Sequence, residues 1–175
     1  IKALRLQTAA RLGFSVPRTC MGSTPASIQS LWHETHGQLA LKGFEQALVA
    51  LADGSERTLY TSPVTVEDLT DVESLRACPS IWQQYVSKQV EIRATVFGHT
   101  VLAAEIHSQQ SETSRHDWRR YDLEHTPYLP HVLPVEVQAK CIKLLQTFGL
   151  FYGAIDLIRT ANVTYVFLEV NPFGQ

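Results

Sequence analysis

The sequence predicts a fold of the α+β class. Apolar residues recur at helical spacing in residues 2–12 and again in 135–148, which indicates two amphipathic helices. By contrast, residues 90–106 and 150–170 contain β-rich runs that are divided only by short turns. Helices and neighbouring strands of this kind favour a sheet with helices packed against it.

The composition is that of an ordinary globular protein. Of 175 residues, 45% are hydrophobic and 18% are charged, which suits one domain or two small subdomains that share an interface. A net charge of −2 provides no basic field, so neither nucleic acid nor a membrane is expected as a partner. No apolar run approaches the roughly 18 residues of a membrane span, and the N-terminus reads as a helix rather than a signal peptide. We therefore expect a cytoplasmic protein.

The first half of the chain predicts short elements. Gly13 suits the end of the first helix, and Thr24 with Pro25 suits the start of the second. DGSE at 53–56 predicts a turn. We expect, in order, a helix over 2–12, a helix from Ala26 to His33, strands over 39–42 and 47–51, a strand over 57–64, a short helix from Thr65 or Asp68 to Leu75, and a strand over 80–86.

The second half predicts longer elements. Gly98-His99 divides two β-rich runs in the manner of a hairpin turn. Residues 110–133 are polar and predict a long loop, a feature that is often functional in a compact domain. A helix over about 135–148 follows, between Pro134 and Gly149. Strands over 150–158 and 163–170, joined by a turn at 160–162, end the chain.

Three oxygen-bearing side chains fall on these last two strands. Asp156 lies inside an apolar run, and Glu169 and Asn171 are two residues apart, so β alternation places both on one face. Two carboxylates and an amide on adjacent strands make a site for a hard cation such as Mg²⁺. The alternative is that the carboxylates only border a half-exposed strand. A carboxylate in an apolar strand is costly unless paired or metal-bound, which favours the metal.

Basic residues that suit phosphate lie in other segments. Lys42 ends an apolar strand and is either a donor to a polyphosphate or an ordinary surface lysine. Arg93 shares a strand face with Glu91, which allows a simple ion pair or an arginine on phosphate beside a carboxylate on hydroxyls. Three arginines of the polar loop surround a tryptophan and are either solvated or placed to clamp an anion: Arg115, Arg119 and Arg120 around Trp118.

Two common kinds of site are not apparent in the sequence. It has neither of the glycine-rich phosphate loops G-x-G-x-x-G and G-x-x-x-x-G-K-[ST]. None of the seven histidines lies at a recognisable spacing from both a carboxylate and a nucleophile, so a catalytic triad is weakly supported. The three cysteines are widely spaced, which favours buried or incidental thiols over a disulfide framework or a zinc site.

The order of these motifs resembles that of the ATP-grasp ligases over nearly the whole chain. Within that superfamily the sequence is similar to the ATP-dependent maturases of ribosomally made peptides, of the microviridin and marinostatin type. The ribosomal-protein glutamate ligases are a related group. The segments that carry the resemblance are LALK (39–42), PSIWQQYV (79–86), EIR (91–93), IHSQ (106–109), DWRR (117–120), GAIDL (153–157) and FLEVNPFGQ (167–175).

The resemblance implies ATP and Mg²⁺ as cofactors and assigns a role to each matching residue. It implies that Lys42 contacts the ATP phosphates, that the backbone of Gln84, Tyr85 and Val86 holds the adenine, and that Glu91 binds the ribose hydroxyls. It implies that Arg93 and Arg119, or Arg120 in place of Arg119, face the γ-phosphate and the acyl phosphate. It implies that Asp156, Glu169 and Asn171 bind Mg²⁺. Lys2 is a weaker match to a lysine of the family's first helix.

The resemblance also implies an ATP-grasp fold with two α+β subdomains. A smaller subdomain over 1–88 would include the N-terminal helix, a larger one over 89–175 would carry the metal strands, and ATP would lie in the cleft between them. In the family a further domain precedes the N-terminal helix, and the chain continues past the metal strand. We therefore expect this sequence to be a fragment of a longer ligase, truncated at both ends.

The implied reaction activates a peptide carboxylate with ATP as an acyl phosphate. A hydroxyl or an amine then attacks, which gives an ester or amide crosslink in a ribosomally synthesised precursor peptide. Two alternatives stay open: a ligase for free amino acids, of the glutamate type, and a non-catalytic ATP-grasp fragment that binds nucleotide or peptide. The oligomeric state is also open, a homodimer included.

Overall fold

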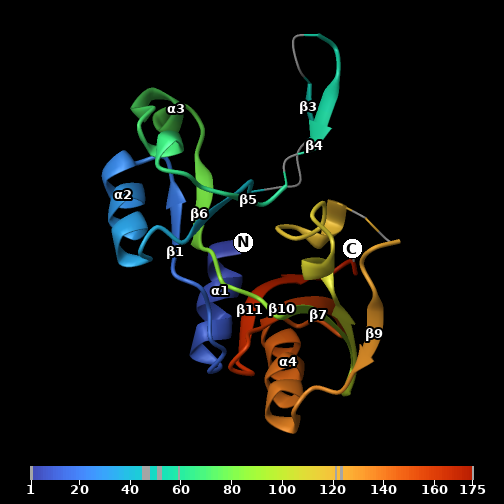
Figure 1. Cartoon of the computed structure of the whole chain (residues 1–175). Coiled ribbons are helices and arrows are strands. Elements are labelled where there is room, and N and C mark those ends of the chain that lie inside the picture. The colour runs from blue at the N-terminus through green and yellow to red at the C-terminus, as the bar shows by residue number, and fades with distance from the viewer. Residues whose placement is uncertain are drawn as a thin grey trace. The chain divides into compact units, whose positions relative to one another are not determined.

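The computed structural model describes residues 2–44, 48–50, 53–58, 60–120, 122 and 124–174, with the backbone alone for 48–50 and 56–58 (Figure 1). The chain forms two compact units. One unit is Arg18–Tyr85, and the other combines Ile1–Pro17 with Val86–Gln175. Each unit has its own antiparallel sheet with helices, so the predicted α+β class is confirmed.

The unit Arg18–Tyr85 is built on a four-stranded sheet in the order β1-β6-β2-β5, and β3 and β4 form a two-stranded sheet. Ile28 and Leu31 of its first helix pack with Leu39 and Trp82 of the sheet and form the core. The elements of this unit are β1 (Thr19–Gly22), α2 (Pro25–Glu34), β2 (Leu39–Lys42), β3 (Leu48–Ala50), β4 (Glu56–Thr58), β5 (Ser62–Pro63), the 3₁₀ helix η1 (Glu67–Leu69), α3 (Val72–Ala77) and β6 (Ser80–Gln84).

The helices of this unit differ from the expected ones at their N-termini. Thr24 precedes α2 as predicted, but within the described part of the chain its side chain makes no capping hydrogen bond. The helix expected over about 65–75 is divided into η1 and α3. The division arises because the Asp71 carboxylate accepts from the Ser74 N–H at 3.1 Å and so caps a new helix.

The single strand expected over 57–64 is wrong. Its two ends pair with different strands, β4 with β3 and β5 with β2. β5 ends at Pro63, which has no N–H to extend a ladder. The strand expected over 47–51 is described at Leu48–Ala50, and its two end residues lie outside the described residues.

The second unit is built on a five-stranded antiparallel sheet in the order β11-β10-β7-β8-β9. Gly98-His99 forms the predicted hairpin turn, since Phe97 pairs with Thr100. The elements of this unit are α1 (Lys2–Arg11), β7 (Val90–Phe97), β8 (Thr100–Ile106), the 3₁₀ helices η2 (Ser108–Gln110) and η3 (Trp118–Arg120), β9 (Tyr128–His131), α4 (Val135–Thr147), β10 (Tyr152–Arg159) and β11 (Tyr165–Asn171).

Helices α1 and α4 cover one face of this sheet (Figure 1). Leu144 of α4 and Ala9 of α1 belong to the same buried cluster as Ile92 and Ile155 of the strands. Alternate residues of β7 and β10 therefore face this core, and the residues between them face the other side of the sheet. The charged residues of the candidate site come from that other face.

The N-terminal helix packs within the second unit, whereas we expected it in a subdomain over 1–88. After α1 the chain runs beside β11, where Ser15 forms a parallel bridge with Val166 and its carbonyl accepts from the Phe167 N–H at 2.8 Å. The rings of Phe14 and Phe167 lie 5.6 Å apart. These contacts attach residues 2–17 to the five-stranded sheet.

The long loop expected over 110–133 contains a strand that the sequence did not reveal. β9 pairs with β8 and is the fifth strand of the sheet. Its side chains are mostly exposed and it includes Pro130, so it lacks the alternation of apolar and polar residues that predicts a strand.

A hydrogen-bonded cluster joins the two edge strands of this sheet. The His131 ring, on β9, places Nδ1 2.7 Å from the Glu105 carboxylate and Nε2 2.9 Å from the Tyr165 hydroxyl, on β11. Glu105 also accepts from Arg159 at 3.3 Å and lies 3.0 Å from the His107 ring. Because β9 and β11 are opposite edges, the sheet must curve enough for the side chains of His131 and Tyr165 to meet.

We expect Glu105→Ala to lower the free energy of unfolding by about 2–3 kcal/mol, because a charged arginine and two histidines lose their acceptor. Tyr165→Phe keeps the ring and removes one hydrogen bond, so it should cost only about 1 kcal/mol. Urea unfolding measures both. Glu136→Ala, at an exposed position of α4, is the control. Equal losses for Glu105→Ala and Tyr165→Phe would show that Glu105 does not organise the cluster.

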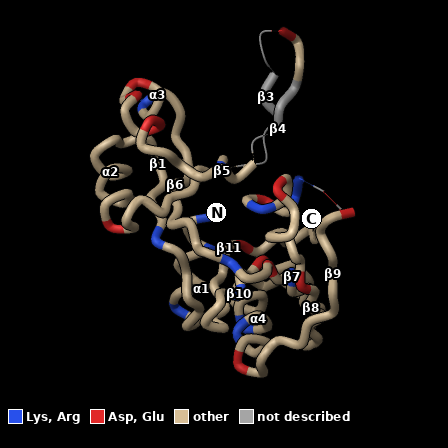
Figure 2. Tube along the Cα trace, in the orientation of Figure 1, with Lys and Arg blue, Asp and Glu red and all other residues tan. Residues whose placement is uncertain are grey.

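No helix within the described ranges is both long and apolar enough to cross a membrane. Lys and Arg positions are interspersed with Asp and Glu along the trace (Figure 2). This distribution agrees with the small net charge of −2.

Candidate active site

A β-bulge places two carboxylates of β10 and β11 opposite each other. Asp156 on β10 pairs with Glu169 on β11, but the next residue of β10, Leu157, pairs with Phe167. One residue, Leu168, is therefore extra on β11. Without the bulge, Glu169 would share the buried face of Phe167. The bulge moves Glu169 and Asn171 to the face that carries Asp156.

Asp156 is the buried centre of this group. Arg93 lies opposite it on β7, and one Arg93 guanidinium nitrogen donates to both Asp156 oxygens, at 2.8 and 3.0 Å. The Asn171 amide donates to Asp156 at 3.3 Å and to Glu169 at 3.4 Å. Burial raises the pKa of Asp156 to about 7, and Glu169 adds to that effect while Arg93 opposes it. A carboxylate that is this costly to ionise is well suited to a divalent cation.

The donor set fits Mg²⁺. In the described part of the chain, no three His, Cys, Asp or Glu side chains gather in a group suited to a metal ion. Asp156 and Glu169 would therefore need the Asn171 amide as a third oxygen ligand. Carboxylate and amide oxygens are the ligands that hard cations prefer, and Mg²⁺ completes its coordination with water and phosphate oxygens.

Arg119 reaches this site from the loop before β9. Its guanidinium donates to both oxygens of Asp117, at 2.8 and 2.6 Å, and its third nitrogen, Nη1, lies 3.9 Å from a Glu169 oxygen. These carboxylates raise the pKa of Arg119 further above its usual value. The ring of Trp118 lies under the Arg93 guanidinium, and the guanidinium carbon is 5.4 Å from the ring centroid. The short turn η3 thus contains Arg119 and contacts Arg93 through Trp118.

Glu91, the predicted ribose ligand, lies on the same face of β7, two residues before Arg93. It forms a buried ion pair with Lys88 at 2.6 Å, and Lys88 also donates to the His116 carbonyl at 3.4 Å. Burial raises the pKa of Glu91, and Lys88 opposes this shift. Among the described residues, Oε2 of Glu91 is buried and has no close hydrogen-bond partner. Such an acceptor suits a donor such as a ribose hydroxyl.

The remaining predicted nucleotide ligands lie in or beside the unit Arg18–Tyr85. Lys42 donates to the side-chain carbonyl of Gln83 at 2.7 Å, and the Gln83 amide donates to the Thr19 hydroxyl at 3.0 Å. The backbone N–H groups of Gln84 and Tyr85 both donate within the sheet region, at 2.8 and 2.9 Å. Val86 comes directly after this unit and is the residue at which the chain re-enters the other unit.

The structure therefore brings together five of the predicted site residues: Arg93, Arg119, Asp156, Glu169 and Asn171. Of the three loop arginines, Arg119 turns inward, whereas Arg115 and Arg120 are exposed. Sequence reasoning missed the residues that hold the predicted ones: Lys88, Asp117 and Gln83. Two of them had a usable signal, since Asp117 is two residues before Arg119 and Lys88 is three before Glu91.

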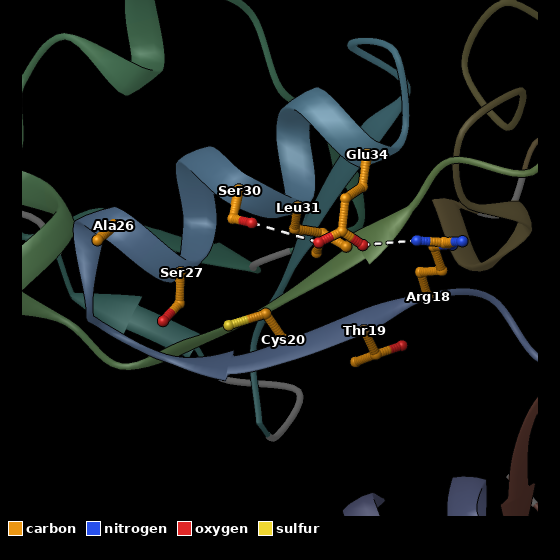
Figure 3. Close-up of a pocket in the computed structure, with 8 residues that line it drawn as sticks. All are labelled: Arg18, Thr19, Cys20, Ala26, Ser27, Ser30, Leu31 and Glu34. Atoms are coloured by element: carbon orange, nitrogen blue, oxygen red, sulfur yellow. Dashed lines mark hydrogen bonds and ion pairs between the residues drawn. The ribbon is translucent and has the colours of Figure 1, made fainter.

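A groove of about 650 Å³ lies elsewhere, between β1 and α2 (Figure 3). Small side chains such as Ala26, Ser27 and Ser30 line it, and Cys20 points into it (Figure 3). An exposed ion pair of 2.6 Å between Arg18 and Glu34 borders it. None of the predicted site residues lines this groove, and exposed ion pairs contribute little to binding or stability.

Comparison with known proteins supports the resemblance of the motifs. No protein-family model and no curated protein matches the sequence. Solved structures do match. The macrocyclase MdnC of Microcystis aeruginosa MRC, bound with its precursor peptide MdnA, is 35% identical, with a TM-score of 0.86 over 99% of this chain and 54% of that one. The macrocyclase MdnB of the same organism is 30% identical, with a TM-score of 0.74 over 100% and 52% of the two chains.

A RiPP-associated ATP-grasp ligase of Chryseobacterium gregarium, solved with ADP and a leader and core peptide, is 30% identical. Its TM-score is 0.92 over 99% of this chain and 52% of that one. The chain thus spans about half the length of the ligases that it matches. The chain therefore has the ATP-grasp fold, and it is 30–35% identical to these proteins over the part that it shares with them.

Proposed function

We propose that the protein is an ATP- and Mg²⁺-dependent ligase that forms ester or amide crosslinks in a ribosomally synthesised precursor peptide. The observation that carries this proposal is the convergence of two carboxylates, an amide and two arginines on one face of β7, β10 and β11. Three similar proteins support the peptide as substrate, because one was solved with a precursor peptide, one with a leader and core peptide, and the third is a macrocyclase.

In this proposal Asp156, Glu169 and Asn171 hold the metal. Bound there, Mg²⁺ would neutralise charge on the ATP phosphates. Arg93 is fixed between Asp156 and the Trp118 ring, so its guanidinium cannot swing freely. Arg119 is held by Asp117 with Nη1 directed toward Glu169. Both arginines are thus oriented before a substrate binds, which is the condition for efficient stabilisation of transition-state charge.

The roles of the other predicted residues are also proposals. Lys42 would contact phosphate, and its contact with Gln83 fixes the direction of its ammonium group. Glu91 would accept from the ribose, which is supported by its buried Oε2, because this atom has no close partner within the described residues. The segment of Gln84, Tyr85 and Val86 would hold the adenine through its backbone. We further propose a cytoplasmic setting, where ATP and Mg²⁺ are supplied.

The proposed reaction has two steps. An oxygen of the peptide carboxylate attacks the γ-phosphorus of ATP, and ADP leaves, which gives an acyl phosphate. A hydroxyl or amine of the peptide then attacks the acyl carbon, loses its proton and expels inorganic phosphate. Neither step requires a protein nucleophile, since phosphoryl transfer depends on positioning and charge neutralisation. In this proposal Arg93, Arg119 and the metal ligands provide the positioning and the charge neutralisation.

Release of ADP in the presence of candidate precursor peptides tests this proposal. We expect ADP only when peptide is present, and a peptide whose mass has fallen by one water for each link. Glu169→Gln should abolish both signals, and Glu136→Gln, at an exposed position, should change neither. ADP that depends on a free amino acid instead would identify an amino-acid ligase. Nucleotide binding without any ADP formation would identify a non-catalytic module.

A further inference from the structure

The loop before β9 is held by buried hydroxyl groups. Ser108, Ser111, Ser114 and Thr126 are all at most 3% exposed. The hydroxyls of Ser114 and Thr126 lie 2.7 Å apart, and the Ser111 hydroxyl accepts from the Ser114 N–H at 3.2 Å. A loop packed by its own polar side chains has a defined conformation. The η3 turn of this loop is therefore held in a fixed position beside the sheet.

Asp117, in the middle of this loop, is 4% exposed, and its carboxylate is hydrogen-bonded to the Arg119 guanidinium. Its two oxygens accept from Nε and Nη2 of the guanidinium, and one of them also accepts from the Arg119 backbone N–H at 3.1 Å. This paired geometry occupies one edge of the guanidinium and fixes its plane. The nitrogen outside the pair, Nη1, faces Glu169.

Arg119 has three carboxylates within its electrostatic reach: Asp117, Glu169 and Asp156. It is hydrogen-bonded to Asp117, whereas its nitrogen stays 3.9 Å from Glu169. An arginine freed from Asp117 would pair directly with the nearest remaining carboxylate, because a desolvated guanidinium seeks a bidentate partner. That partner is Glu169, and the pair would compete with a cation for the carboxylate.

We propose that Asp117 is a positioning residue that holds Arg119 off the metal-binding carboxylates and directs its Nη1 into the site. This inference rests on the proposed function of the same site. Asp117 does not touch the reacting atoms in this account. It acts through Arg119, in the way that outer residues orient metal ligands and tune their affinity.

The test measures Mn²⁺ binding in the presence of ADP by calorimetry, together with kcat and the KM for ATP. We expect Asp117→Asn to weaken Mn²⁺ binding about tenfold and to lower kcat by about 10²-fold, in the range found for residues that support metal ligands. Asp117→Glu keeps the buried charge but shifts the guanidinium, so it should fall between Asp117→Asn and the wild type. Glu112→Gln, exposed in the same loop, should change neither quantity.

The double variant Asp117→Asn with Arg119→Gln separates positioning from a merely structural role. With Arg119 removed, its guanidinium no longer competes for Glu169, so Mn²⁺ affinity should return to that of Arg119→Gln alone while kcat stays low. Mn²⁺ binding that is equally weak in the double variant would overturn the proposal, as would an Asp117→Asn protein within twofold of wild type in both quantities. A protein that shows these shifts in Mn²⁺ binding but makes no ADP with peptide would refute the proposed function and leave the positioning intact.

Discussion

Asp156→Asn is expected to abolish Mg²⁺-dependent nucleotide binding and, at the same time, to stabilise the metal-free protein at pH 8. The first effect follows because the variant removes one of two carboxylates from the proposed metal site. The second follows because the buried carboxylate is costly to ionise, with a pKa raised to about 7. Asparagine keeps an oxygen acceptor for Arg93 but carries no charge.

The sign of the pH dependence follows from the direction of that shift. A carboxyl group whose pKa is higher in the folded state binds its proton more tightly there, so it favours folding at low pH. The metal-free wild type should lose this contribution as the pH rises from about 4 to about 7, by a few kcal/mol at roughly 1.4 kcal/mol per pKa unit. Asp156→Asn should not show this decline.

Thermal unfolding in EDTA between pH 5 and 8, and calorimetry with ADP and Mg²⁺, measure the two effects. In the wild type, Mg²⁺ affinity should increase with pH up to about 7, because the metal competes with the proton on Asp156. Glu136→Gln is the matched control at an exposed carboxylate. An Asp156→Asn protein that is less stable than wild type at pH 8, or that still binds ADP in a Mg²⁺-dependent way, would contradict this account.

Arg93→Ala is expected to lower kcat by about 10²–10³-fold, the usual cost of losing one oriented donor to transition-state charge. Arg93→Lys should recover little of this activity. The guanidinium both stacks over Trp118 at 5.4 Å and donates to Asp156 at 2.8 Å, whereas an ammonium is a point charge that cannot keep both contacts.

Steady-state kinetics across pH measure this effect. Arg93 lowers the pKa of Asp156, so its removal should also shift the rise of activity to higher pH. Arg76→Lys, in an exposed ion pair with Glu73, is the control and should retain wild-type kcat. An Arg93→Lys protein with nearly wild-type kcat would show that catalysis needs neither the stacking of the guanidinium on Trp118 nor its pairing with Asp156.

The sequence predicted most of the sheet that carries the site. The hairpin turn at Gly98-His99, the helix before Gly149 and the two last strands all occur where apolar periodicity placed them. Glu169 and Asn171 were correctly placed on one face, because a spacing of two is enough for that. The bulge at Leu168 was not predictable from alternation, and it decides that this face is the one shared with Asp156.

Other features could not be predicted because they depend on contacts distant in sequence. The attachment of residues 2–17 to β11 rests on the backbone pairing of Ser15 and on the contact of Phe14 with Phe167, whose partners are distant in sequence. β9 has exposed side chains and a proline, so it carries no strand signal. The pairing of Asp117 with Arg119 is local and was within reach, but a polar loop gives no sign of which carboxylate is buried.

Transfer of ¹⁸O from a labelled peptide carboxylate to phosphate tests the central claim most directly. If the carboxylate attacks the γ-phosphorus and phosphate leaves from the acyl carbon, then one labelled oxygen should appear in inorganic phosphate for each crosslink formed. The measurement is mass spectrometry of the phosphate and of the peptide from one reaction mixture. Unlabelled phosphate accompanying a crosslinked peptide would contradict activation of the carboxylate as an acyl phosphate.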